Sequence, residues 1–145
     1  MKQLPSIFMI EDNVNDETLV RLALDRQPDK YDLVIARDGE EAIDCLTSRG
    51  KTADPSHLSL ILLDLKLPKV NGLEVLRRIR ADARVKSTPV VVWTSSCEPA
   101  DLSTAYQLGC NSFVQKPMDF AAFCKALKQI TGYWVDLNRT PQTFV

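Results

Sequence analysis

Short apolar runs rich in β-branched residues alternate along this chain with longer segments whose apolar residues recur at helical spacing. Such runs are typical of buried strands. The expected strands are 7–10, 33–36, 58–63, 90–93 and 112–115. The run 58–63 is apolar along nearly its whole length, as expected for a strand that is buried on both faces.

The segments between and after these runs are amphipathic and predict helices over 16–26, 39–49, 72–81, 99–108 and 120–130. In the last of these, apolar side chains recur at i, i+3, i+7 and i+10 and form one stripe that we expect to face the sheet. The stripe consists of Phe120, Phe123, Leu127 and Ile130.

Residues that start or stop helices lie at the expected boundaries. Pro28 follows the first helix, Pro99 fits a first helical position, and Asn71 is expected to cap the helix at 72–81. Three glycines stand where glycine commonly ends a helix, namely Gly50, Gly109 and Gly132.

Alternating strands and helices predict the α/β class, with one doubly wound parallel sheet, right-handed crossovers and helices on both faces. In such a sheet the functional crevice lies outside the carboxyl ends of the strands. We therefore expect the residues that follow each strand to converge on one site.

Composition agrees with one ordinary globular domain. The chain has 145 residues, 45% of them hydrophobic, and its 18 basic against 19 acidic residues give a net charge of -1. This balance provides no global field that would recruit nucleic acid or an acidic membrane. No apolar stretch approaches the roughly 20 residues of a membrane span, and the start of the chain lacks a signal-peptide pattern. We expect a cytoplasmic protein.

Cysteine and histidine usage excludes several kinds of site. Cys45, Cys97, Cys110 and Cys124 are too far apart in sequence to form a CxxC pair, so we expect reduced and mostly buried thiols. The single histidine, His57, excludes multi-histidine metal sites and argues against Ser-His-Asp catalysis.

Polar residues follow four of the expected strands. They are Glu11, Asp12, Asp64, Thr94 and Lys116. Two like charges about 4 Å apart repel by roughly 4 kcal/mol at an effective dielectric constant near 20, so three converging carboxylates call for a cation. Oxygen ligands without histidine or cysteine favour magnesium or manganese. Asp64 also ends an apolar run, where burial of an unpaired carboxylate is costly.

These residue types suit phosphoryl transfer. A carboxylate beside a bound metal can attack a phosphoryl group and form an aspartyl phosphate. In that chemistry Asp64 is the nucleophile, Lys116 pairs with the phosphate charge, and the Thr94 hydroxyl donates to a phosphate oxygen.

The pattern resembles the receiver domain of two-component response regulators over about residues 7–130. The resemblance is carried by an acidic pair, an aspartate with downstream proline and glycine, a threonine, a lysine-proline pair and an aromatic three residues before the lysine. These residues are Glu11, Asp12, Asp64, Pro68, Gly72, Thr94, Phe113, Lys116 and Pro117.

The resemblance implies a flavodoxin-like sheet with strand order 2-1-3-4-5 and a phosphorylation switch that takes its phosphoryl group from a histidine kinase onto Asp64. It implies Mg2+ held by Asp12, Asp64 and the backbone carbonyl of Lys66, with Glu11 acting through water. Such a protein is not an enzyme in the ordinary sense, since it catalyses only transfer to itself and slow autodephosphorylation.

The family also implies how the switch works. The residue at Thr94 moves toward the phosphate and the aromatic at Phe113 turns inward, which reshapes the face of helix 4, strand 5 and helix 5. In the family the positions of Lys66 and Ser96 help to set the phosphoryl lifetime, and a cis peptide precedes the proline at Pro117.

The domain bounds, one polar loop and the C-terminal tail add detail. We expect a receiver domain over 1–131 and a tail over 132–145, without an output domain. The polar loop 50–57 and the aromatic tail are similar to single-domain regulators that serve bacterial phytochrome kinases. This similarity implies such a kinase, a downstream protein target, and a homodimer through the helix 4–strand 5–helix 5 face and the tail. The alternative is that Tyr133 and Trp134 fold back on the core.

Other functions fit the residues less well. A haloacid dehalogenase phosphatase needs an aspartate where this chain has Lys66, and the acidic pair after the first strand would repel the phosphate of a flavin. A basic run, Arg77, Arg78, Arg80, Arg84 and Lys86, does not share one helix face, and we interpret it as solvated surface. The main alternative is a pseudo-receiver that binds partners without phosphorylation, which weak magnesium affinity would reveal.

Overall fold

The computed structural model describes residues 4–47 and 57–141 of the chain. Its five strands form one parallel sheet in the order β2-β1-β3-β4-β5, as predicted. The strands are β1 (Ser6–Ile10), β2 (Asp32–Ala36), β3 (Leu58–Leu63), β4 (Val90–Thr94) and β5 (Ser112–Gln115). Each lies within one residue of its expected bounds, because the apolar runs define them directly.

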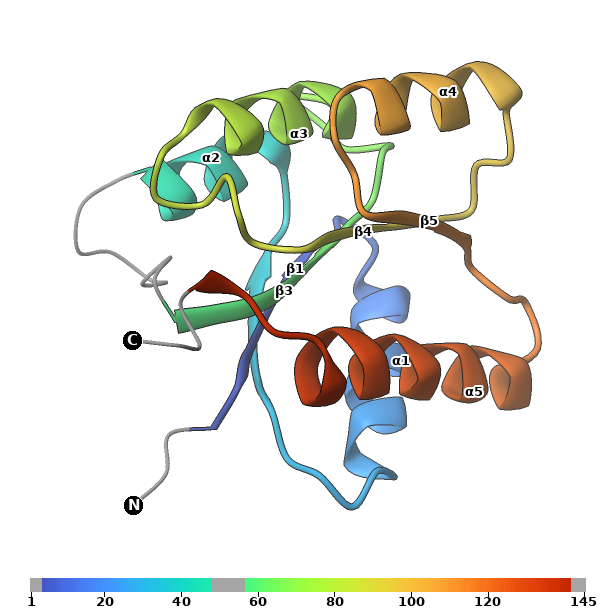
Figure 1. Ribbon diagram of the computed structural model, residues 1–145. Helices are drawn as coiled ribbons and strands as arrows, with labels where there is room; N and C mark the ends of the chain where they lie inside the picture. The colour runs from blue at the N-terminus through green and yellow to red at the C-terminus, as the bar shows by residue number, and fades with distance from the viewer. Residues whose placement is uncertain (1–3, 48–56, 142–145) are drawn as a thin grey trace.

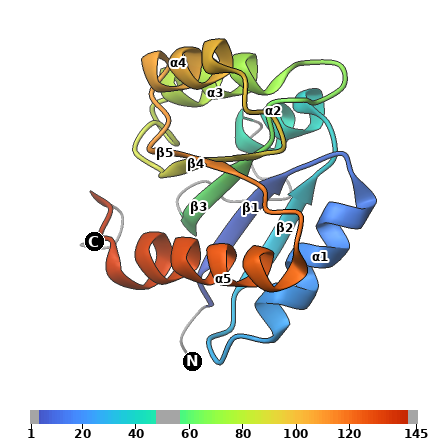
Figure 2. The same ribbon diagram turned by 90° about the vertical axis from the view of Figure 1, so that its right-hand side faces the viewer.

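The helices cover both faces of this sheet. They are α1 (Val14–Asp25), α2 (Gly39–Thr47), α3 (Gly72–Ala81), α4 (Pro99–Gln107) and α5 (Phe120–Thr131). Figure 1 shows α2, α3 and α4 on one face and α1 and α5 on the other. The view in Figure 2 shows the same two helical layers with the sheet between them.

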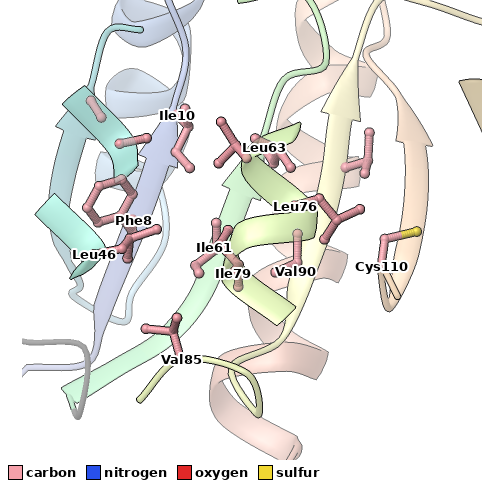
Figure 3. Packing of buried hydrophobic residues seen from close by; sticks show 14 of the residues in the cluster. Phe8, Ile10, Leu46, Ile61, Leu63, Leu76, Ile79, Val85, Val90 and Cys110 are labelled. Atoms are coloured by element: carbon pink, nitrogen blue, oxygen red, sulfur yellow. The ribbon is translucent and has the colours of Figure 1, made fainter. Parts of the chain in front are cut away.

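Each face of the sheet has its own hydrophobic core. Alternate residues of β1 point to opposite faces, so Phe8 and Ile10 belong to one core and Ile7 and Met9 to the other. The first core lies under α2 and α3 and includes Leu76 (Figure 3). Burial of each such side chain contributes about 1.5–3 kcal/mol. Burial on both faces explains why the three inner strands, β1, β3 and β4, are nearly continuous apolar runs.

The second core lies between the sheet and helices α1 and α5. Trp93 of β4 packs edge to face on Phe123 of α5, with ring centroids 5.1 Å apart. Phe123, Leu127 and Ile130 are buried there, as the spacing of the stripe predicts, while Phe120 is only half-buried. The Arg26 guanidinium lies over the Phe120 ring, 4.9 Å from its centroid.

Most helix boundaries follow the predicted residues. Asn71 caps α3 by accepting a hydrogen bond from the Glu74 backbone N–H over 3.0 Å, and Pro99 opens α4. Gly109 follows α4 with φ of +100°, a conformation that favours glycine. Gly50 lies outside the described residues.

Two boundary predictions are wrong. The first helix begins at Val14, two residues early, because the Asn13 side chain accepts from the backbone N–H groups of Asn15 and Asp16 and caps it there. Gly132 does not end the last helix, since its φ is -61° and the chain continues as a π-helix, η2 (Gly132–Leu137).

The η2 segment packs back onto the protein. Trp134 and Val135 pack against the second core, and burial of these side chains explains why the chain stays helical after Gly132. The Tyr31 hydroxyl donates to Asp136 Oδ2 over 3.1 Å and ties the segment to the start of β2. Tyr133 stays 48% exposed. One aromatic of the pair therefore folds back while the other remains available.

Two further observations concern the cysteines and the helices of the described residues. All four cysteines are described, and no disulfide joins them; Cys45 and Cys110 are buried, Cys124 is half-buried and Cys97 is exposed. Within 4–47 and 57–141, none of the helices has the length and apolar character needed to cross a membrane.

Candidate functional site

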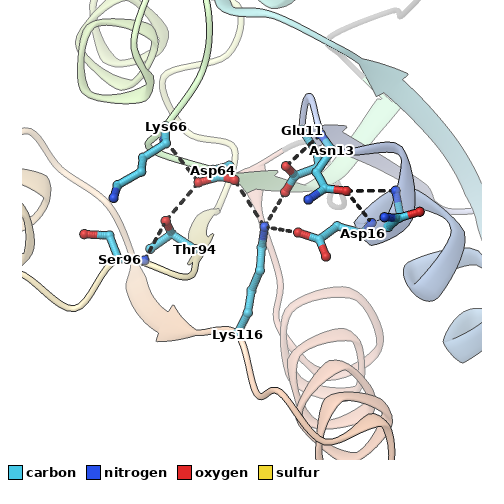
Figure 4. Close-up of polar contacts among 9 residues, drawn as sticks. Glu11, Asn13, Asp16, Asp64, Lys66, Thr94, Ser96 and Lys116 are labelled. Atoms are coloured by element: carbon cyan, nitrogen blue, oxygen red, sulfur yellow. Dashed lines mark hydrogen bonds and ion pairs between the residues drawn. The ribbon is translucent and has the colours of Figure 1, made fainter.

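The residues predicted at the strand ends lie together at the carboxyl edge of the sheet. Glu11 follows β1, Asp64 follows β3, Thr94 ends β4 and Lys116 follows β5. Figure 4 shows these four side chains converging on one point. They meet because parallel strands end at the same edge of a sheet. The structure therefore confirms the prediction that these side chains converge at one edge of the sheet.

Asp64 is the centre of this group. Its Oδ1 accepts hydrogen bonds from Thr94 Oγ1 over 2.9 Å and from the Lys66 backbone N–H over 3.1 Å. Its Oδ2 accepts from Lys116 Nζ over 3.1 Å. The Asp64 side chain is only 8% exposed, and this full set of partners offsets the cost of burying its charge.

A close approach of two loops sets the position of Asp64. A Cβ atom on Gly72 would lie 2.3 Å from the Asp64 carbonyl oxygen, so only glycine fits at the start of α3. The Gly72 N–H donates to the Leu65 carbonyl over 2.9 Å. This contact explains why a glycine stands eight positions after the aspartate.

Lys116 is held by three carboxylates. Its Nζ contacts Glu11 Oε2, lies 2.7 Å from Asp16 Oδ2 and 3.1 Å from Asp64 Oδ2. Its backbone N–H donates to the Thr94 carbonyl over 2.8 Å. Burial lowers the pKa of Lys116, but the Asp64 charge and the bonds to Asp16 and Glu11 outweigh it, so the pKa is raised. Lys116 is therefore a fixed positive charge.

Glu11 is the most deeply buried of the three carboxylates that contact Lys116, with its side chain 1% exposed. Burial raises the pKa of Glu11 to about 7, and the nearby Asp64 charge adds to this rise although Lys116 opposes it. The Asn13 backbone N–H donates to Glu11 Oε1 over 3.1 Å. Asp12, next in the chain, is exposed to solvent.

The carboxylates at this edge fit a hard divalent cation. Oxygen atoms of Glu11, Asp12 and Asp64 lie within 4.8 Å of one another. The donors are all oxygens, which is the set that Mg2+ and Mn2+ prefer. With Asp16 included, carboxylates outnumber the Lys116 ammonium, so bound positive charge would relieve their repulsion.

Asp16 was not predicted as a site residue. The expected helix began at residue 16, which placed this side chain at a solvent-exposed helix end. The actual start at Val14 puts Asp16 in the first turn of α1, facing Lys116. The available signal was the Asn13 cap, which moves the helix start to the sheet edge.

Thr94 links Asp64 to the first turn of α4. The Ser96 backbone N–H donates to Thr94 Oγ1 over 3.3 Å, and the Ser96 hydroxyl donates to Asp101 Oδ2 over 2.9 Å. Phe113 is half-buried against the first core. The expected cis peptide before Pro117 is wrong, because all peptide bonds in the described residues are trans, the form favoured even before proline.

The basic run near α3 is largely occupied by contacts within the protein. Arg77 and Arg78 pair with Glu74, and Arg84 donates to the Leu46 carbonyl over 3.0 Å. Arg80 donates to the carbonyls of Gly109, Lys86 and Thr88 and to the side chain of Asn111. Arg80 therefore has a structural role in joining α3 to the segments that lead into β4 and β5.

Comparison with known proteins gives consistent matches. The family model for the response regulator receiver domain matches residues 7–128. The probable methanogenesis regulatory protein FilR2 of Methanothrix harundinacea is 36% identical over 135 residues, covering 93% of this chain and 86% of FilR2. Response regulator Rcp1 of Synechocystis sp. is 33% identical over 135 residues, covering 93% and 92%.

Solved structures agree with these sequence matches. The phosphorylated cyanobacterial phytochrome response regulator RcpA superposes with a TM-score of 0.88 at 35% identity, over 96% of this chain and 99% of RcpA. The Mn(2+)-bound form of Rcp1 gives a TM-score of 0.84 at 32% identity, over 94% and 99%.

Proposed function

Since this chain belongs to the receiver domain family of two-component response regulators, we propose that Asp64 is its phosphoacceptor and that Thr94 and Lys116 bind the transferred phosphoryl group. One observation supports this assignment above all. The Asp64 carboxylate accepts a hydrogen bond from the Thr94 hydroxyl at Oδ1 and from the Lys116 ammonium at Oδ2, so both donors are already in place around the attacking carboxylate.

The transfer follows from these positions. An Asp64 oxygen attacks the phosphorus of a phosphohistidine on the kinase, an O–P bond forms and the P–N bond breaks. The imidazole leaves with the electron pair and takes a proton from solvent. Lys116 supplies a fixed positive charge to the phosphoryl oxygens, and Thr94 supplies a hydroxyl donor.

We assign the metal site to Asp12, Asp64 and the backbone carbonyl of Lys66, with Glu11 acting through water. Bound Mg2+ supplies positive charge that offsets the phosphate oxygens and the crowded carboxylates. The all-oxygen cluster supports this assignment, and one solved relative is a Mn(2+)-bound form. Asp12 is the exposed member and is open to an incoming ion.

The chemistry of the protein is limited to its own aspartate. It transfers one phosphoryl group to Asp64 and releases it by slow autodephosphorylation, so it is a switch and not a turnover enzyme. Phosphorylation then draws Thr94 toward the phosphate, and Phe113 turns inward beside α4. The hydrogen bonds from Thr94 through Ser96 to Asp101 support a path to α4.

We place the partner among the cytoplasmic sensor histidine kinases of bacterial phytochromes. The support is that RcpA, a phytochrome response regulator, is 35% identical over 96% of this chain. The test is phosphotransfer in vitro from a phytochrome kinase and from an unrelated histidine kinase, to wild type and to Asp64→Asn. We expect faster transfer from the phytochrome kinase than from the unrelated kinase, and transfer to wild type alone. Equal transfer to Asp64→Asn would reject Asp64 as the phosphoacceptor, and equal rates from the two kinases would reject the phytochrome kinase as the partner.

We further propose a homodimer in which receiver residues 1–131 pair through α4, β5 and α5 and the tail 132–145 joins the contact. We also propose that the protein acts on a downstream protein target. The support for the dimer is a set of large exposed side chains, Leu102, Tyr106, Tyr133 and Leu137. Sedimentation equilibrium of wild type and of Tyr106→Ser with Tyr133→Ser tests it. A dimer that the double substitution weakens is expected, and a monomer in both would overturn the proposal.

A pseudo-receiver that signals without phosphorylation is not favoured. Such a module has no need for an acidic cluster, a buried lysine and a threonine around one aspartate, and this chain has all of them. Magnesium affinity in the micromolar to millimolar range supports the phosphorylation switch, and its absence would favour the pseudo-receiver.

A further inference from the structure

The Lys116 ammonium has no hydrogen left for an incoming phosphoryl group. An ammonium carries three N–H donors, and in this structure Glu11, Asp16 and Asp64 each accept one of them. The Lys116 side chain is only 7% exposed, so water does not offer an easy replacement partner. One of the three carboxylates must therefore release Lys116 before a phosphoryl oxygen can bind it.

Asp16 differs from the other two partners in its surroundings. Its side chain is 23% exposed, against 1% for Glu11 and 8% for Asp64. A carboxylate that can regain water loses less on release than one that stays buried and unpaired. Asp16 also lies in the first turn of α1, where the helix N-terminus favours a negative charge even without Lys116.

Asp16 also stands apart from the metal cluster. The carboxylates of Glu11, Asp12 and Asp64 group together, and Asp16 does not belong to that group. Within the described residues, the Asp16 carboxylate pairs with Lys116 alone, at 2.7 Å. A bound cation would thus engage the other carboxylates and leave Asp16 as the remaining competitor for the ammonium.

We propose that Asp16 is a positioning residue that holds Lys116 in the resting protein and competes with the phosphoryl group for it. This inference rests on the proposed function, since it assumes that Lys116 binds phosphoryl oxygens. Release of Asp16 is then part of every phosphorylation event, and the strength of its contact with Lys116 biases the protein toward the resting state.

The test is an equilibrium titration with beryllofluoride, a non-covalent mimic of the phosphoryl group, in the presence of Mg2+ and followed by 19F NMR. Asp16→Asn keeps the size of the side chain but weakens its hold on Lys116. We expect this variant to bind beryllofluoride about three- to tenfold more tightly than wild type, because one charged hydrogen bond no longer competes for Lys116.

A matched control removes the same charge one residue further along. Glu17 lies on the same turn of α1 but pairs with Arg37 at 3.0 Å and with Arg21 at 3.4 Å, away from Lys116. We expect Glu17→Gln to bind beryllofluoride within about twofold of wild type, since the Glu17 carboxylate pairs with two half-exposed arginines and does not contact Lys116. An equal gain in both variants would overturn the inference, because it would show a general effect of charge.

A double-mutant cycle separates a contact with Lys116 from a direct effect of the Asp16 charge on the anion. In a Lys116→Met background, the substitution Asp16→Asn should no longer change beryllofluoride affinity. The same gain in both backgrounds would contradict a role through Lys116. The 15N and 1H signals of the Lys116 ammonium give a second readout, since Asp16→Asn should shift them and Glu17→Gln should not.

The outcomes distinguish a failure of this inference from a failure of the proposed function on which it rests. Tighter binding in Asp16→Asn that disappears in the Lys116→Met background supports it. Wild type that binds beryllofluoride while Asp16→Asn binds equally or more weakly overturns the inference and leaves the proposed function standing. Wild type that binds no beryllofluoride with Mg2+ overturns both.

Discussion

The Thr94 hydroxyl donates its hydrogen bond to Asp64 Oδ1 over 2.9 Å, and both side chains are buried. A hydroxyl has one hydrogen to donate, so in the resting protein the Thr94 hydroxyl donates to Asp64 and to no other acceptor. A phosphoryl group on Asp64 would offer a more strongly charged acceptor at the same place. The contact therefore makes the position of Thr94 sensitive to the state of Asp64.

Thr94→Val should separate phosphorylation from its consequence. We expect the variant to accept a phosphoryl group, because Lys116 and the carboxylates remain, but to lose the chemical-shift changes in α4 that wild type shows by NMR. Loss of the hydroxyl also leaves the Ser96 N–H without its acceptor, which should cost about 1 kcal/mol of stability. Thr94→Ser is the control and should respond like wild type; an intact α4 response in Thr94→Val would refute the coupling.

Glu11 should make stability depend on pH when metal is absent. Its pKa in the folded protein is raised to about 7 from 4.5, chiefly by burial. Between these values the folded state binds more protons than the unfolded state, so the free energy of unfolding falls as pH rises toward 7. Lys116 stays charged in both states over this range and adds no dependence.

Urea unfolding in chelator at pH 5 and pH 8 measures this effect. Relative to Glu11→Gln, wild type should lose roughly 2 to 3 kcal/mol between the two pH values, since one pKa unit corresponds to about 1.36 kcal/mol. Parallel stabilities of wild type and Glu11→Gln at both pH values would show that Glu11 titrates normally.

Magnesium should stabilise the protein through the acidic cluster. At a concentration of about 100 times its dissociation constant, a ligand that binds only the folded state adds about 2.7 kcal/mol. Asp12→Asn removes one carboxylate of the cluster, so the gain in Tm on adding Mg2+ should shrink, while stability in chelator should equal or exceed that of wild type.

Asp44→Asn is the matched control for the magnesium experiment, because Asp44 is an exposed carboxylate on α2, outside the cluster. It should keep the full rise in Tm. A wild-type Tm that does not change with Mg2+ would reject the metal site, and an unchanged rise in Asp12→Asn would reject the assignment of Asp12.

Arg80 should be important for stability and not for phosphorylation. Its guanidinium donates to three backbone carbonyls over 2.8–3.0 Å and to Asn111 Oδ1 over 2.7 Å. Arg80→Ala leaves these acceptors without their donor and should cost about 2–4 kcal/mol in urea unfolding. Arg78→Ala, which removes only an exposed pair with Glu74, should cost less than about 1 kcal/mol. Similar losses in the two variants would contradict the structural role of Arg80.

The sequence could predict the sheet and most of the site for one physical reason. Parallel strands buried on both faces are apolar runs, so the residue after each such run, for example Glu11 after β1 or Asp64 after β3, can be recognised from the sequence and lies at a common edge. The hydrogen-bond partners within the site could not be predicted from the sequence. Which carboxylate bonds Lys116 depends on side-chain geometry that residue order does not contain.

Asp16 and Gly132 show where sequence patterns fail. Asp16 joins the site because a side-chain cap at Asn13 starts α1 early, and capping shifts a helix by only a few residues without changing its apolar spacing. Gly132 is a common helix terminator, yet Trp134 and Val135 gain burial if the chain continues. In the first case a local side-chain cap sets the helix start, and in the second a tertiary contact overrides a local preference.

Intact-protein mass after incubation with a small acyl-phosphate donor tests the phosphoacceptor assignment with the fewest assumptions. The samples are wild type and Asp64→Asn, each with magnesium and with chelator. The account predicts the addition of one phosphoryl group to wild type with magnesium and no addition in the other three samples. A phosphoryl group on Asp64→Asn, or equal addition to wild type in chelator, would contradict the assignment of Asp64 and its metal-assisted chemistry.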